Sequence, residues 1–99
     1  NYGGHLALYT RITGGAHTEK MRIDNAGNVG IGTTPLYDLH VNNASNSNLC
    51  ISVGSADEAR ILSMNDADNA YKALKFYASS HSFVNGNVGI GKAQVMRLY

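Results

Sequence analysis

The chain has 99 residues, a formal net charge of +1 and a charged fraction of 15%, which is low beside the roughly 25% of an average soluble domain. This length suits one small domain, and a near-neutral chain without a Lys/Arg cluster argues against nucleic acid as a partner. No apolar run approaches the roughly 20 residues that cross a bilayer, so we expect no membrane insertion. The one cysteine, Cys50, stands in an apolar run and is expected to be a buried small hydrophobe.

The first two thirds of the chain alternate apolar and polar residues, which is the period of a half-buried β-strand. The pattern predicts strands near residues 6–12, 20–24, 29–31, 37–41 and 49–53, separated by turns rich in Gly, Asn and Ser. Residues 56–64 fit two interpretations. Acidic residues after Ser55 are typical of a helix start, but Ala59, Ile61 and Ser63 recur with a period of two, so we predict a strand.

The last third of the chain continues this β-type pattern. Leu74 and Phe76 lie on one face of a strand predicted over residues 71–78. Asn85 and Gly86 then give a strong hairpin signal, because both central residues of a type I′ turn need positive φ. We therefore predict a tight hairpin at this point.

A six-residue motif, Gly-Asn-Val-Gly-Ile-Gly, occurs at residues 27–32 and again at residues 86–91. In each copy a turn leads into a short Val-x-Ile strand, and the longer turn of the first copy is predicted to end in Gly27 at positive φ. The glycine spacing fits neither a phosphate loop nor a dinucleotide fingerprint, so we expect no cofactor. The chain starts without Met and stops inside the second copy's pattern, which predicts one β module, residues 1–99, cut from a longer chain.

The motif has one apolar face and one face made of glycine. Its β-branched residues, which we expect to form the core of a trimer, are Val29, Ile31, Val88 and Ile90. The glycine face lets another backbone approach closely, and two apolar residues per strand are too few for a wide core in one chain. The glycines given structural roles are Gly27, Gly30, Gly32, Gly86, Gly89 and Gly91. The alternative is a monomeric β-sandwich in which they are only turn residues.

Residues 21–35, MRIDNAGNVGIGTTP, followed by Leu-His-Val at residues 39–41, resemble a segment of bacteriophage tail fibres and tailspikes. That segment often precedes an endosialidase-type intramolecular chaperone domain. The second copy departs from the pattern after Gly91, where Lys-Ala-Gln replaces Thr-Thr-Pro. In that family such segments belong to intertwined homotrimeric β-structured shafts. The resemblance therefore implies self-association in a virion tail, with host cell-surface polysaccharide or lipopolysaccharide as a further partner.

Side chains that carry chemistry are sparse. The four histidines have no metal-ligand spacing, and His40 is expected on the outward, solvated face of its strand unless a trimer axis gathers three copies of it. A glycosidase needs paired carboxylates, and the candidates fall in predicted turns, where acids usually bond to local backbone: Asp57, Glu58, Asp66 and Asp68. We therefore expect neither a metal site nor an enzyme.

Exposed tyrosines are the remaining candidates, because a flat ring with a polar tip suits sugars. Tyr71 and Tyr77 share one face of the predicted strand over residues 71–78, and Tyr9 lies on the polar face of the first strand. Packing between chains is the other interpretation of all three.

Taken together, the residues and the resemblance predict an all-β fold of short strands and hairpins, built as an intertwined homotrimeric fibre segment. Its predicted function is that of a shaft or tip that supports receptor binding at the outer surface of a bacterial host. Two alternatives stay open: a fragment of a polysaccharide-degrading tailspike and a monomeric carbohydrate-binding β-sandwich.

Overall fold

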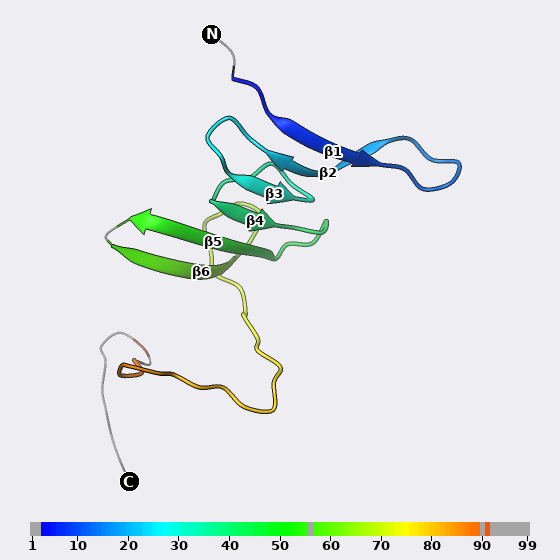
Figure 1. Ribbon diagram of the computed structural model, residues 1–99. Coiled ribbons are helices and arrows are strands. Elements are labelled where there is room, and N and C mark those ends of the chain that lie inside the picture. Colours follow the sequence, from blue (N-terminus) through cyan, green and yellow to red (C-terminus); the bar gives the residue numbers. More distant parts are fainter. Residues whose placement is uncertain (1–2, 56, 90, 92–99) are drawn as a thin grey trace.

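The computed structural model describes residues 3–55, 57–89 and 91, and these form one open six-stranded sheet (Figure 1). The strands lie side by side in chain order: β1 (Leu6–Thr10), β2 (Thr18–Ile23), β3 (Val29–Ile31), β4 (Leu39–Val41), β5 (Asn48–Ser55) and β6 (Glu58–Met64). The all-β prediction is confirmed, and no helix occurs among the described residues. Within the ambiguous stretch at residues 56–64, the predicted strand is present as β6, while residue 56 lies outside the described residues. One sheet is present in the described chain, so the alternative of two packed sheets is wrong for it.

The turn between β2 and β3 has the predicted geometry. Asp24 accepts hydrogen bonds at its carboxylate from the backbone N–H of Ala26 (3.0 Å) and of Asn28 (2.8 Å). Gly27 closes the turn at a φ of 89°, a conformation that residues with a side chain rarely adopt. The local hydrogen bonds of one aspartate therefore fix the entry into the first copy of the motif.

The motif itself is explained by an unusually short parallel connection. Strands β3 and β4 pair in parallel, although parallel neighbours usually need about a dozen residues or more between them. Here residues 32–38, the crossover loop, suffice. A β-carbon at Gly30 would lie closer than 3.0 Å to the Thr33 carbonyl oxygen and to Pro35, and one at Gly32 would meet the Asn42 carbonyl oxygen. Glycine is therefore required because the chain crosses directly over its own strand.

The crossover loop covers one face of the sheet. On that face, paired positions on adjacent strands are Gly30, His40, Cys50 and Leu62. The Cys50 side chain is fully buried and His40 is only 5% exposed. This confirms that Cys50 is a buried hydrophobe, and its burial raises the pKa of the thiol. The predicted close approach to the glycine face is made by the chain's own backbone.

The environment of His40 differs from the expected one. His40 does face away from the Leu39 and Val41 side, but it is buried rather than solvated because the crossover loop folds over it. The backbone N–H of Leu36 donates to Nδ1 at 3.1 Å, so Nε2 carries the proton and donates to the Asn48 side-chain oxygen at 2.7 Å. The imidazole is thus a neutral structural link between the loop and β5.

Asn48 completes this network by using every hydrogen-bonding position of its amide. Its oxygen accepts from His40 and from Asn42 (2.7 Å), and its nitrogen donates to the Met64 carbonyl (3.2 Å) and to Asp66 (2.9 Å). The described residues leave no buried side-chain nitrogen or oxygen without a partner. One satisfied amide therefore ties together β4, β5 and the end of β6.

Beyond β6 the strand prediction fails. Tyr71 makes a single bridge with Met64, and no regular strand or hairpin follows in residues 72–89, which we call the arm. Asn85 has positive φ (65°) but Gly86 does not, so the predicted type I′ turn is wrong. The arm runs away from the sheet (Figure 1), and the radius of gyration of 17.7 Å exceeds the roughly 13 Å expected of a compact chain of this length.

Candidate assembly face

The uncovered side of the sheet carries two rows of aliphatic side chains. Directly paired residues put their side chains on the same face, so the strand register defines each row. The first row runs Leu6, Ile23, Val29, Leu39, Ile51, Ile61. The second runs Leu8, Met21, Ile31, Val41, Leu49, Ser63. We call these two rows the aliphatic face.

The aliphatic face carries no charge, and all of its side chains but Ser63 are exposed or half-buried. Leu6 at one edge is 61% exposed and Ile61 at the other is 58% exposed. Six strands spaced about 4.8 Å apart make each row roughly 24 Å long. Continuous exposed apolar surfaces of this kind are uncommon on monomeric proteins and usually mark an interaction site. The aliphatic face is therefore the candidate interaction surface of the described chain.

The structure places three of the four residues predicted for the trimer core, in two different settings. Val29 and Ile31 lie in the middle of the aliphatic face, on the central strand β3. Val88, in the second copy of the motif, is 41% exposed on the arm. Ile90 lies outside the described residues. The two copies of the motif therefore have the same sequence but different surroundings, and only the first is part of the sheet.

The glycines of the motif also differ between copies. Gly27 and Gly32 have positive φ in the first copy, and Gly91 does in the second. Gly86 has neither positive φ nor a neighbour within 4 Å of an added β-carbon. Glycine at 86 therefore has no visible structural requirement in the single chain. Gly89 lies on the arm, outside any regular strand.

The three tyrosines proposed for glycan contact are all exposed but are not brought together. Tyr9 lies on the edge strand β1, and Tyr71 lies beside the end of β6 at the opposite edge. Tyr77 lies on the arm, so the strand face that it was predicted to share with Tyr71 does not form. The single chain therefore has no tyrosine platform made of these residues.

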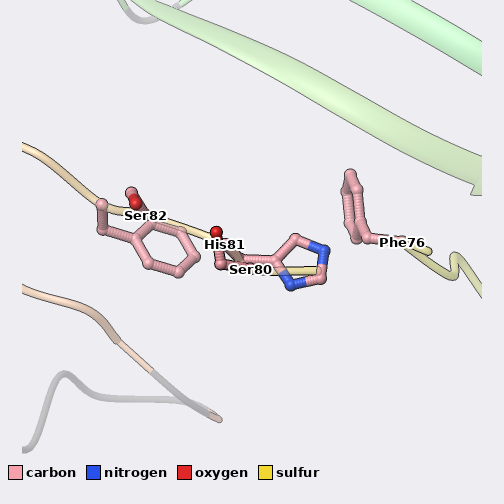
Figure 2. Close-up of a pocket in the computed structure, with 5 residues that line it drawn as sticks. Phe76, Ser80, His81 and Ser82 are labelled. Carbon is pink, nitrogen blue, oxygen red and sulfur yellow. The ribbon is translucent and has the colours of Figure 1, made fainter. Parts of the chain in front are cut away.

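A cleft of about 430 Å³ lies on the arm and was missed from the sequence. It is lined by Phe76, Ser80, His81, Ser82 and Phe83, all from one segment. Figure 2 shows the Phe76 ring facing the His81 ring, and their centroids are 5.8 Å apart in an edge-on arrangement. Both phenylalanine rings are largely exposed. One extended segment of the arm therefore supplies every residue that lines the cleft.

The candidate carboxylates lie at opposite ends of β6. Asp57 and Glu58 are at its start, and Asp66 and Asp68 follow its end, roughly 20 Å away along an extended strand. Asp66 accepts from Asn48, and Asp68 accepts from the Tyr37 hydroxyl. Within the described ranges no three metal-ligating side chains gather. The acids are thus dispersed in one chain, with local structural roles for the second pair.

The Tyr37–Asp68 contact closes the crossover loop against the turn after β6. The hydrogen bond to Asp68, helped by partial burial, raises the pKa of Tyr37 to about 12. The Tyr37 ring also meets the His40 ring edge-on, with centroids 5.9 Å apart. This side chain therefore helps to hold the loop over the covered face.

Comparison with known proteins found no matching family model, no similar curated sequence and no similar solved structure. The described residues also include no helix long and apolar enough to cross a membrane.

Proposed function

We propose that this chain is a non-enzymatic, structural and adhesive segment of a bacteriophage tail fibre or tailspike, which works as a homotrimer. The proposal joins two lines of support. The motif at residues 21–35 resembles the corresponding segment of such fibres. The aliphatic face supplies the surface that an assembly of identical chains needs.

The observation that carries the proposal is the composition of that face. Eleven of its twelve positions are aliphatic or Met, and Ser63 is the exception. Natural sheets that stay monomeric usually guard such surfaces and their edges with charge. Burying the two rows between copies would stabilise the assembly by about 25 cal/mol for each Å² of apolar surface removed from water. Three chains round an axis would place the three copies of β3 at the centre.

The proposed role places the segment in the virion tail, at the outer surface of a bacterial host. The shaft or tip would present its covered face and the end of its arm outward, while the aliphatic face is internal. Host polysaccharide or lipopolysaccharide is the proposed adhesive partner. The exposed aromatic side chain of Phe83, on the arm, is of the type that contacts sugars.

Light scattering coupled to size exclusion tests the assembly. At micromolar concentration we expect a mass of three chains, and a mass of one chain or of two would contradict the proposal. The adhesive part is tested by binding of the assembled protein to immobilised bacterial lipopolysaccharide and capsule polysaccharide. Absence of binding to either, across several host preparations, would leave the segment as a shaft without a receptor contact.

A further inference from the structure

The outer edge of β6 is open over most of its length. The preceding strand β5 pairs with β6 on one side from end to end. On the other side, hydrogen bonds within the described chain reach only the last part of the strand: Lys72 N–H donates to the Ser63 carbonyl at 2.8 Å, and Asn65 N–H to the Ala70 carbonyl at 3.0 Å. Residues 58–62 therefore keep an unpaired backbone edge next to the aliphatic face.

The pairing that does form fixes how a further strand would lie. The bridge between Met64 and Tyr71 is antiparallel. Continued in the same register, it would put Leu74 opposite Ile61 and Phe76 opposite Ala59. Ile61 belongs to the first row of the aliphatic face, so Leu74 would extend that row by one strand. Residues 73–77 thus have the pattern of a seventh strand.

The chain's own arm is turned away from this edge. The Ser63 hydroxyl donates to the Ala73 carbonyl at 3.0 Å. Ser63 points to the aliphatic face, so this bond draws the backbone at Ala73 out of the plane of the sheet. The arm then leaves β6 (Figure 1), with Leu74 and Phe76 exposed. Among the described residues, one chain therefore holds both an unpaired strand edge and a segment with a strand pattern, and does not join them.

We propose that residues 73–77 of a neighbouring copy add to the outer edge of β6 as an antiparallel strand. The partner is a second copy because the edge and the matching segment belong to the same sequence, and because the local Ser63–Ala73 bond diverts the segment from its own edge. Lys72 of the same chain already occupies the position beside Ser63, so the neighbour's strand begins beside Leu62, in the register that continues the Met64–Tyr71 bridge. Leu74 of the neighbour then lies against Ile61, and Phe76 against Ala59.

Such an exchange agrees with a closed ring of copies. Each chain gives its arm to the next and receives one from the previous chain, which is a heterologous contact that closes when the rotation allows it. Main-chain hydrogen bonds supply affinity and the alternating side chains supply register. The one unfavourable pair is Arg60 opposite Lys75, although Glu58, diagonal to Lys75 and 3.7 Å from Arg60, offsets the like charge. This inference rests on the proposed assembly and specifies its strand pairing.

Disulfide trapping between two variants tests the pairing. Met64 and Tyr71 form a non-hydrogen-bonded pair. Such pairs recur at every second residue of an antiparallel pair of strands, so positions 60 and 75 would form another one. Their Cα atoms would lie about 4.5 Å apart, which is within the range of a disulfide. Arg60→Cys and Lys75→Cys are made in separate copies, mixed unfolded and refolded together. Both side chains are exposed and the resident Cys50 is fully buried. We expect a covalent dimer linked through positions 60 and 75, located by peptide mapping.

The control pairs Lys75→Cys with Arg11→Cys, which removes the same charge beyond the opposite edge strand β1. We expect the 60–75 link to exceed the control on the order of a thousandfold, the ratio of a millimolar effective concentration to the micromolar free one. A trimeric mass without this link would overturn the strand exchange and leave the proposed assembly standing. When Arg60→Cys and Lys75→Cys are combined in one chain, a link that forms only within that chain would overturn it too. A monomeric mass without the link would overturn both proposals.

Discussion

The carbonyl oxygen of Thr33 lies directly over the α-carbon of Gly30, in the space that a side chain would fill. Pro35, which is buried, closes the same space, with its Cδ 2.8 Å from the position of a β-carbon. This contact lets residues 32–38 connect two parallel neighbouring strands without a helix. The glycine of the motif is therefore a consequence of the short crossover.

Gly30→Ala should destabilise the fold, because the new methyl group forces the crossover loop off the sheet. We expect the free energy of unfolding to fall by about 1–3 kcal/mol, the usual cost of overpacking. Urea unfolding followed by circular dichroism measures it. The matched control is Gly86→Ala in the second copy, where an added β-carbon meets nothing within 4 Å and a change within about 0.5 kcal/mol is expected. Equal effects at both sites would contradict the role given to Gly30.

The sequence predicted the elements that depend on local chemistry. Alternation located all six strands, Asp24 and Gly27 identified the turn before β3, and the glycine face indicated a close backbone approach. The approach proved to be intrachain because β3 and β4 pair in parallel, and the order of strands in a sheet depends on long-range contacts. The same limit explains His40, whose burial depends on a loop that folds back over the strand.

His40 and Asn48 should behave as one unit in a double-mutant cycle. His40→Phe keeps the ring but leaves the Leu36 N–H and one Asn48 lone pair unmatched, which should cost about 2–6 kcal/mol at one to three per group. Asn48→Leu should cost at least as much. The double variant should cost less than the sum by about 1–3 kcal/mol.

The control for this cycle combines Asn48→Leu with His81→Phe. His81 lies on the arm, where it meets Phe76, and shares no contact with the network. These two changes should be additive within about 0.5 kcal/mol. If the free-energy changes of His40→Phe and Asn48→Leu were additive, the two side chains would act independently. That result would contradict a stabilising hydrogen bond between them.

The Tyr37 hydroxyl should lose its proton at a higher pH than an ordinary tyrosine does. Asp68 accepts a hydrogen bond from the Tyr37 hydroxyl, and this raises the pKa of Tyr37 from 10.0 to about 12 in the folded chain. The protonated phenol is favoured by folding, so its stabilising effect is complete below about pH 10 and is lost as the pH rises towards 12. Ultraviolet difference titration should therefore show a late step.

Three variants assign that step. Tyr37→Phe should abolish it, and Asp68→Asn should move the pKa of Tyr37 back towards its ordinary value because the charged acceptor is lost. Tyr77→Phe, on the arm, should leave the late step in place. Persistence of the step in Tyr37→Phe would rule out the Asp68 contact as its cause.

The arm shows where sequence patterns stop being informative about one chain. Leu74 and Phe76 have the alternation of a strand, and Asn85 with Gly86 has the composition of a hairpin, yet neither forms in residues 72–89. Local preference is satisfied only when a pairing edge is available, and here the Ser63–Ala73 hydrogen bond diverts the chain from the nearest edge. The proposed strand exchange would give this segment the pairing edge that it lacks in one chain.

Ile31→Asp should prevent assembly while leaving the single chain folded. Ile31 is at the centre of the aliphatic face and exposed in one chain, so a carboxylate there stays hydrated until a second copy covers it. Burying that unpaired charge should cost about 3–5 kcal/mol or more per site. We expect light scattering to give one chain instead of three, with a far-ultraviolet circular dichroism spectrum that still shows a folded β-sheet. Ile12→Asp makes the same change on an exposed residue outside the two rows and should leave the trimer intact. A trimer that tolerates aspartate at position 31 would exclude the aliphatic face as the assembly surface.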